Sequence, residues 1–352
     1  MIRAILTAAL LLLTGAPALA QSPAQNHPVV IAHRGASGLR PEHTRAAYEL
    51  AIEQGADFIE PDLVMSKDGA FVVRHENEIG GTTDVAAHPA FADRKTTRVI
   101  DGVSTTGWFT EDFTLAELRT LKARERLPAF RPANTAFDGQ NGILTFDEVV
   151  AIAREASTRT GRTISVAPEL KHPSYFATIG LPMEDGFVAM LERLDLTGAD
   201  APILIQCFEV GPLERLALRI RSPLLQLMGG PGGPVDKPGL TYAAMATPQG
   251  LKTIRAYAGA IGVETAMIVP RGPDGASLPA TSLIPDAHAA GLKVVSWTFR
   301  AENAFLPTEL RRGDAMADHG DLAGQLRQFR DLGVDAVFSD FPGLAVEAFK
   351  AE

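Results

Sequence analysis

Short runs of aliphatic and β-branched residues alternate with helical patterns along most of this 352-residue chain, and this alternation limits its possible folds. Eight runs are predicted as strands: Val29–Ala32, Phe58–Met65, Ser165–Leu170, Ile203–Gln206, Leu224–Leu227, Ala260–Val263, Val294–Thr298 and Ala336–Ser339. Helical patterns fill the gaps at Glu42–Gln54, Phe146–Ser157, Pro182–Leu194, Pro212–Ile220, Pro248–Tyr257, Pro285–Ala290, Leu322–Leu332 and Gly343–Phe349. Eight alternations favour an α/β fold of the closed (β/α)₈ TIM-barrel type over an open doubly wound sheet.

One connection is too long to be a simple loop. Residues 76–145, between His75 and Phe146, are rich in Thr, Asp, Gly and Pro, with one helical patch at Leu115–Lys122. Long connections inside a compact domain usually form functional covers or small subdomains. We therefore expect an inserted small subdomain after the second strand, lying over the mouth of the barrel.

The first twenty residues have the pattern of a secretory signal peptide. Arg3 is followed by an apolar run from Ala4 to Leu13 and by small residues ending at Ala20. No later run reaches about 18 uninterrupted apolar residues, which argues against stable membrane insertion. We expect cleavage after residue 20 and a mature barrel domain, residues 21–352, that is periplasmic or secreted.

The charge of the chain argues against nucleic acid as a partner. The formal net charge is −9, and removal of Arg3 with the signal peptide makes it one unit more negative. A duplex-binding protein needs a basic face, and no Lys/Arg cluster of that kind is present. Cys207 is the only cysteine, so an intramolecular disulfide is excluded, and we expect its thiol to pack as a small apolar group. The sequence does not indicate an oligomeric state.

Reactive side chains gather where the predicted strands end. His33 and Arg34 follow the first strand, Glu60 and Asp62 lie in the second, and His75 closes another apolar run. Side chains at the carboxyl ends of parallel strands meet in one mouth, which is how α/β enzymes assemble sites from distant residues. Imidazoles, a guanidinium and carboxylates together favour catalysis on an anionic substrate.

Three carboxylates are predicted metal ligands. Glu60 and Asp62 are two residues apart, so their side chains lie on the same side of a strand, and Glu169 lies on the next strand. Converging carboxylates would repel one another without a cation between them. Oxygen ligands suit a hard divalent ion, and we expect Ca²⁺ ahead of Mg²⁺, although ligand types alone do not separate the two. The simpler alternative for Glu60 and Asp62 is an exposed pair at a strand end.

His33 and His75 are the candidates for proton transfer, because imidazole titrates near neutral pH. Arg34 and Lys171 add positive charge that could hold phosphate oxygens, although both could instead form salt bridges with the acidic residues. The remaining histidines considered, to which we assign no chemical step, are His43, His88, His172 and His288. Phe208 and Trp297 end later strands and are expected to line an apolar part of the pocket, with core packing as the alternative.

Several segments together resemble the glycerophosphodiester phosphodiesterases, particularly the secreted bacterial type. These segments are His33–Thr44, Glu60-Pro61-Asp62-Leu63, Val72-Val73-Arg74-His75, Pro168-Glu169-Leu170-Lys171, Gln206-Cys207-Phe208 and Asp340-Phe341-Pro342. The resemblance spans nearly all of the mature chain. It implies a (β/α)₈ barrel with an inserted subdomain and hydrolysis of small glycerophosphodiesters to glycerol 3-phosphate and an alcohol.

The resemblance also implies roles for individual residues. Metal binding falls to Glu60, Asp62 and Glu169, acid/base catalysis to His33 and His75, phosphate contacts to Arg34 and Lys171, and a position near the glycerol or the metal to Glu42. One departure is visible. The family commonly has Asp after the second histidine, whereas this chain has Glu76, which puts the setting of His75 in question.

Two alternatives stay open at this level. A related phospholipase of the sphingomyelinase or lysophospholipase D type would act on intact lipids, and release of head groups from vesicles would identify it. A non-catalytic phosphodiester-binding protein would bind without turnover. All candidate positions are filled in this chain, which favours the enzyme, but a fold alone does not fix a function.

Overall fold

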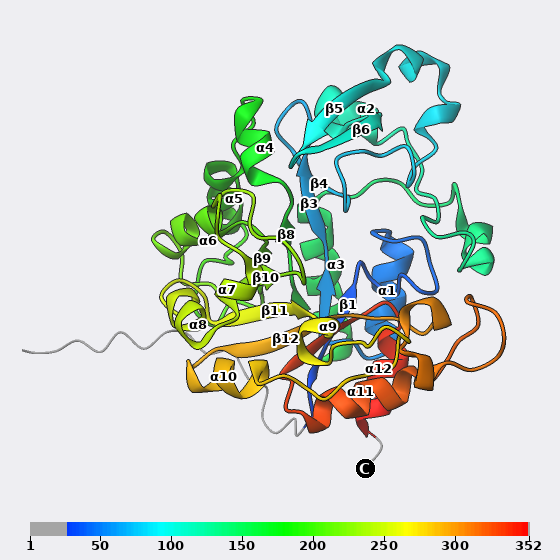
Figure 1. Cartoon of the computed structure of the whole chain (residues 1–352). Helices are drawn as coiled ribbons and strands as arrows, with labels where there is room; N and C mark the ends of the chain where they lie inside the picture. Colours follow the sequence, from blue (N-terminus) through cyan, green and yellow to red (C-terminus); the bar gives the residue numbers. More distant parts are fainter. Residues whose placement is uncertain (1–26, 351–352) are drawn as a thin grey trace, which may run out of the picture.

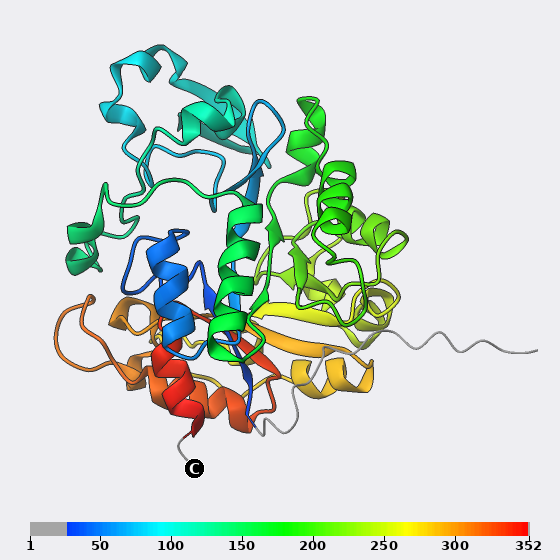
Figure 2. The ribbon, with the colours of Figure 1, turned by 180° about the vertical axis from the view of Figure 1, so that it is seen from behind.

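In the computed structural model, which describes residues 27–350, eight strand positions close into a parallel barrel (Figures 1 and 2). In spatial order these are β1 (Val29–His33), β2 (Phe58–Glu60) continued by β3 (Asp62–Met65), β7 (Ser165–Val166) continued by β8 (Glu169–Leu170), β9 (Ile205–Cys207), β10 (Leu224–Met228), β11 (Ala260–Glu264), β12 (Lys293–Phe299) and β13 (Ala336–Ser339). Each position pairs in parallel with the next, and β13 pairs with β1. The predicted TIM barrel is confirmed. The predicted signal peptide, residues 1–20, lies outside the described residues.

Prolines divide the second and third strand positions. Pro61 separates β2 from β3, and Pro168 precedes β8. Proline has no N–H to give to a strand ladder, so the regular pairing is interrupted there. The backbone nitrogen of Glu169 still donates to the oxygen of Pro61 at 3.0 Å, which keeps the two positions side by side. The interruptions fall beside the three candidate metal ligands.

The helices cover the outside of the barrel (Figures 1 and 2). The predicted ones are observed as α1 (Arg45–Glu53), α3 (Phe146–Thr160), α5 (Met183–Arg193), α6 (Val210–Ala217), α8 (Pro248–Ile254), α10 (Leu283–Ala289), α11 (Leu322–Asp331) and α12 (Pro342–Lys350). Both ends of helix α3 are fixed by its sequence. Thr145 and Glu148 form a capping box at its N-terminus, and Gly161, with a φ of 68°, ends it. The sequence did not predict α4 (Pro173–Thr178), α7 (Tyr242–Met245) and α9 (Thr265–Ile268). No helix in residues 27–350 is long and apolar enough to cross a membrane.

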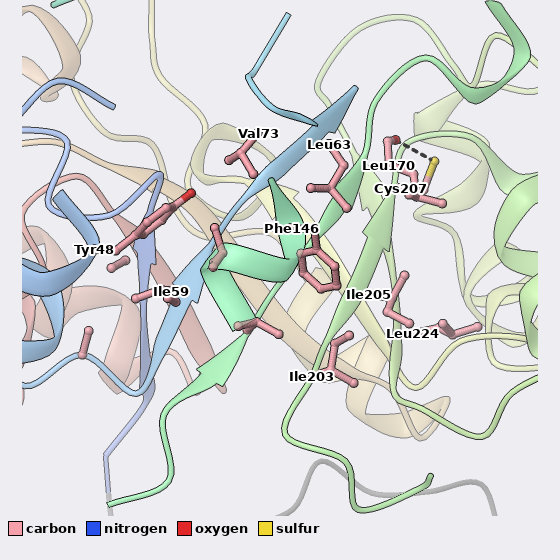
Figure 3. Close-up of a cluster of buried hydrophobic side chains, with 14 of the residues drawn as sticks. Tyr48, Ile59, Leu63, Val73, Phe146, Leu170, Ile203, Ile205, Cys207 and Leu224 are labelled. Carbon is pink, nitrogen blue, oxygen red and sulfur yellow. Dashed lines mark hydrogen bonds between the residues drawn. The ribbon is translucent and has the colours of Figure 1, made fainter. Parts of the chain in front are cut away.

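Two cores result from the alternation of side chains along each strand. The barrel interior is filled by apolar side chains that include Ile31, Leu225, Val295 and Phe338. A larger core lies between the sheet and the helices. Figure 3 shows part of this outer core, with Phe146 of α3 beside residues of the strands. Cys207 belongs to it and is 1% exposed, as expected for a packed thiol.

Residues 76–145 form a separate layer over the barrel end from which β3 rises (Figure 1). They contain the hairpin β5 (Thr96–Ile100) and β6 (Val103–Gly107), helix α2 (Leu115–Leu118) and the 3₁₀ helices Val85–Ala87, Pro89–Arg94, Thr110–Asp112 and Pro132–Phe137. Two further 3₁₀ helices, Asn303–Phe305 and Thr308–Leu310, follow β12.

The run before His75 is not a further barrel strand. It is β4 (Phe71–Val73), which pairs antiparallel with β3 through Leu63 and Val73. The chain leaves the barrel along β3, turns at Gly69, whose φ is 80°, and returns along β4. The nitrogen of Arg74 then donates to the oxygen of Asp62 at 3.0 Å, so His75 comes back to the level of the mouth.

Candidate active site

The barrel places polar side chains at the upper end of its interior. Successive residues of a strand point to opposite faces, so a residue two positions after an interior one also faces inward. Ile31 is interior and His33 follows it; Ala167 is interior and Glu169 follows it. The closed ring of strands therefore brings side chains from distant parts of the sequence into one mouth.

Glu60, Asp62 and Glu169 form a compact acidic cluster. Each offers a carboxylate oxygen within 4.8 Å of the others, and all three side chains are buried. Burial and the charge of Asp62 raise the pKa of Glu60 well above its usual range. Burial also raises the pKa of Glu169 to about 8, against the nearby charge of Lys171. Three crowded oxygen donors, two of which are costly to ionise, fit a hard divalent cation.

The pKa of Asp62 is lowered, unlike the pKa values of Glu60 and Glu169, because neighbouring residues stabilise its carboxylate. His43 lies with Nε2 2.8 Å from Oδ2 of Asp62 and with Nδ1 2.8 Å from the hydroxyl of Tyr48. Although burial opposes ionisation, His75, the hydrogen bond with His43 and the charges of Lys171 and Arg34 together keep the pKa of Asp62 well below its ordinary value. This contact between His43 and Asp62 was not expected from the sequence, where nothing indicates the left-handed φ of 58° at His43.

Each of the two candidate proton carriers has a carboxylate beside Nδ1. Nδ1 of His33 lies 2.6 Å from Oδ1 of Asp340, and Nδ1 of His75 lies 2.9 Å from Oε1 of Glu76. A carboxylate accepts, so Nδ1 donates and Nε2 is left as an acceptor toward the cavity. Nε2 of His75 lies 3.3 Å from Nζ of Lys171. From the sequence, Asp340 was expected only as part of the segment Asp340-Phe341-Pro342 that carries the family resemblance.

Both imidazoles are neutral at pH 7 in this arrangement. Burial and the charge of Arg34 lower the pKa of His33 to about 4, and Asp340 opposes this shift. Burial and the charges of Arg34 and Lys171 lower the pKa of His75 to about 3. A neutral ring can accept a proton at Nε2, and at His75 this atom already accepts a hydrogen bond from Lys171.

Arg34 and Lys171 supply the expected positive charge and also form ion pairs. The guanidinium of Arg34 lies 3.0 Å from Oε2 of Glu42 and 3.3 Å from Oδ2 of Asp62, while its backbone nitrogen donates to Glu60 at 2.7 Å. Nζ of Lys171 lies 3.0 Å from Oε1 of Glu169. The geometry is thus compatible both with salt bridges to the acidic residues and with binding of phosphate.

Glu42 is buried behind Arg34 and does not line the cavity. Its Oε2 accepts from Arg34 at 3.0 Å and from Nε of Arg126 at 2.7 Å. Arg126 comes from the insertion, so Glu42 joins the first barrel turn to that segment. This placement makes Glu42 a support for cations, and its predicted contact with substrate stays a prediction.

A cavity of about 420 Å³ contains the remaining candidates. Its polar lining includes His33, Arg34, Glu60, His75, Glu169 and Lys171, and its apolar lining includes Phe208 and Trp297. The rings of Phe208 and Trp297 meet edge to face with centroids 5.8 Å apart. Lining residues that the sequence analysis did not assign are Arg126, Gln206, Leu227, Thr298, Arg300 and Phe338.

Comparison with known proteins agrees with this geometry. A glycerophosphodiester phosphodiesterase of Arabidopsis thaliana is 36% identical over 330 residues, which cover 90% of this chain and 85% of that protein. The fold is similar to that of a proposed glycerophosphoryl diester phosphodiesterase from Silicibacter pomeroyi, with a TM-score of 0.63 and 19% identity over 93% of this chain and 94% of that one. It is also similar to an Oleispira antarctica phosphodiesterase solved with the product sn-glycerol-3-phosphate, with a TM-score of 0.57 and 20% identity over 92% and 98% of the two chains.

The family assignment rests on the sequence match along the chain. The model of the glycerophosphoryl diester phosphodiesterase family matches residues 33–344, from the first candidate histidine to the start of the last helix. This range includes every residue of the mouth described above. The chain therefore belongs to the glycerophosphoryl diester phosphodiesterase family, whose members are phosphodiester hydrolases.

Proposed function

We propose that the protein hydrolyses small glycerophosphodiesters to glycerol 3-phosphate and an alcohol, with a divalent cation and two histidines. The observation that carries the proposal is the arrangement of His33 and His75. Each ring has a carboxylate beside Nδ1, and each lines a cavity that is also lined by Glu60 and Glu169 of the acidic cluster. The family assignment supports the substrate class.

Glu60, Asp62 and Glu169 are the proposed cation ligands, with Ca²⁺ expected ahead of Mg²⁺. A bound divalent cation would polarise a phosphoryl oxygen and lower the pKa of a nearby hydroxyl. The hydrogen bond with His43 orients the Asp62 carboxylate and contributes to its lowered pKa. Ligand orientation by such outer hydrogen bonds commonly changes metal affinity about 10-fold to 100-fold.

Arg34 and Lys171 are proposed to bind the phosphate. Arg34 keeps its charge because Glu42 and Asp62 raise its pKa against the effect of burial. Its position is fixed by two carboxylates, so little side-chain freedom is lost when an anion binds. Charged donors in a buried mouth stabilise the negative charge that develops in the transition state.

The two histidines are proposed to divide the proton transfers. A neutral ring accepts the proton of the attacking hydroxyl at Nε2, and the other ring delivers a proton to the departing alkoxide. In the empty site burial keeps both rings neutral. An anionic phosphate beside them raises an imidazole pKa, which favours protonation of one ring once substrate is bound. Phe208 and Trp297 are proposed to pack against the carbon skeleton of the substrate.

The decisive experiment measures glycerol 3-phosphate release from a panel of glycerophosphodiesters after metal is stripped and Ca²⁺ or Mg²⁺ is restored. We expect turnover only with metal, and a loss of about 10²-fold to 10⁴-fold in His33→Ala and His75→Ala. His288→Ala is the matched control, because His288 pairs with Asp335 on the outside of the barrel. Absence of turnover under every metal would refute the proposal. Head-group release from lipid vesicles, without turnover of glycerophosphodiesters, would identify the protein as a phospholipase instead. Export to the periplasm or medium, proposed from residues 1–20, is tested by fractionation.

A further inference from the structure

Glu76, the residue that departs from the common family pattern, bridges two histidines. Its Oε1 lies 2.9 Å from Nδ1 of His75, and its Oε2 lies 3.1 Å from Nε2 of His172. Nδ1 of His172 in turn lies 2.5 Å from Oδ2 of Asp101. A continuous row of four side chains thus runs from the cavity to the insertion.

The contacts of His172 identify it as a cation. Both ring nitrogens face carboxylates, which only accept hydrogen bonds when ionised, so both nitrogens must carry a proton. Although burial disfavours the charge, the hydrogen bonds to Asp101 and Glu76 raise the pKa of His172 to about 9. His172 is therefore a fixed positive bridge between two negative groups.

Backbone geometry fixes both ends of this bridge. Asp101 and Gly102 form the turn between β5 and β6, with φ of 49° and 83°. Two positive φ values at an Asp-Gly pair are those of the tight turn that suits a hairpin. His172 has a φ of 51° and precedes Pro173, the first residue of α4. The row therefore links the tip of the β5–β6 hairpin to the loop after β8.

We propose that His172, with Asp101, is a positioning residue that holds Glu76 so that Glu76 orients His75. The inference rests on the proposed function of His75. Glutamate has one more rotatable bond than aspartate, and the Glu76 side chain is 49% exposed, so one hydrogen bond to His75 leaves it free to rotate. The second bond, to His172, removes that freedom and keeps Nε2 of His75 directed at the cavity.

The variants His172→Asn and Asp101→Asn test this role without straining the backbone. Asparagine tolerates the left-handed conformation of both positions, but at 172 it cannot reach both carboxylates, and at 101 it removes the charge. We expect kcat to fall roughly 10-fold to 100-fold in His172→Asn, with KM little changed. The effects of His172→Asn and Glu76→Gln on kcat should be far from additive, because each substitution interrupts the same row of side chains. His288→Asn is the matched control.

A readout independent of turnover separates this inference from the proposed function. In protein with ¹⁵N-labelled histidine, the Nδ1–H signal of His75, assigned with His75→Gln, should shift or broaden in His172→Asn while that of His33 stays. If wild-type protein has no turnover but the His75 signal responds, the proposed function fails and the positioning stands. If His172→Asn and Asp101→Asn both retain wild-type kcat and an unchanged His75 signal, the inference is overturned.

Discussion

The Nδ1 atom of His33 lies 2.6 Å from Oδ1 of Asp340, and this carboxylate is almost entirely inaccessible to solvent. Its other oxygen, Oδ2, contacts Arg131 at 2.5 Å and Arg300 at 2.9 Å. The charges of the two arginines outweigh the effect of burial and hold the pKa of Asp340 well below its usual range. Asp340 thus fixes His33 more firmly than the half-exposed Glu76 fixes His75.

Asp340→Asn should impair both catalysis and stability. The amide oxygen could still accept from His33, but the buried Arg131 would lose one carboxylate partner. Leaving a buried ion pair without one partner typically costs about 3–5 kcal/mol. We expect a lower free energy of unfolding in urea and a kcat reduced roughly 10-fold to 100-fold. Asp185→Asn, at an exposed pair with Arg219, is the control that should change neither value.

The pH dependence of kcat/KM should reflect the lowered pKa values of the histidines. For free enzyme with His33 near 4 and His75 near 3, the acidic limb should lie near pH 4 rather than near the ordinary value of 6.5. Each histidine contributes stability above pH 6.5 that is lost as pH falls through its lowered value. NMR of labelled histidine should show both rings neutral at pH 7. An acidic limb or ring titration near 6.5 would contradict this prediction.

Cation binding should release protons at pH 7. Because the pKa of Glu169 is raised to about 8, its carboxyl is mostly protonated in metal-free protein, and a cation requires the carboxylate. Calcium added to weakly buffered protein should acidify the solution, and Glu169→Gln should reduce both the acidification and the affinity. Glu155→Gln, on the exposed face of α3, is the matched control.

The raised pKa of Glu169 should also make the stability of metal-free protein depend on pH. A carboxyl whose folded pKa lies above its unfolded value of 4.5 contributes stability below that value, and this contribution is lost as pH rises through about 8. Urea unfolding of stripped protein should therefore show stability declining over this interval, and saturating cation should remove the decline. If the Glu169→Gln variant shows the same decline in stability, the decline arises from another titrating group.

The barrel strands were predictable because burial on both faces demands continuous apolar runs. The residues that end those runs were also predictable, since strand ends meet at one mouth. The direction of β4 was not predicted, although Asp68-Gly69 is a hairpin signal, and the same signal at Asp101-Gly102 marks the β5–β6 turn.

Partners from remote segments escaped prediction for a different reason. His33 and Asp340 are 307 positions apart and meet only because β13 pairs with β1. No local pattern encodes that contact. Likewise, His43 reaches Asp62 through a left-handed turn whose conformation the sequence does not reveal. Helix and strand patterns predict where backbone lies, whereas side-chain networks follow from closure of the whole barrel.

Arg131 should couple the insertion to His33. It comes from residues 76–145, and its guanidinium contacts Glu302 at 2.6 Å, Asp340 at 2.5 Å and the oxygen of Ser37 at 2.9 Å. Lysine keeps one charge but cannot satisfy three acceptors in a fixed fork. Arg131→Lys should therefore lower both the free energy of unfolding and kcat, and it should change the Nδ1–H signal of His33 while leaving that of His75. Arg124→Lys, at a largely exposed pair with Asp138 in the same insertion, is the control. Wild-type kcat and an unchanged His33 signal in folded Arg131→Lys would show that the insertion does not act through Asp340.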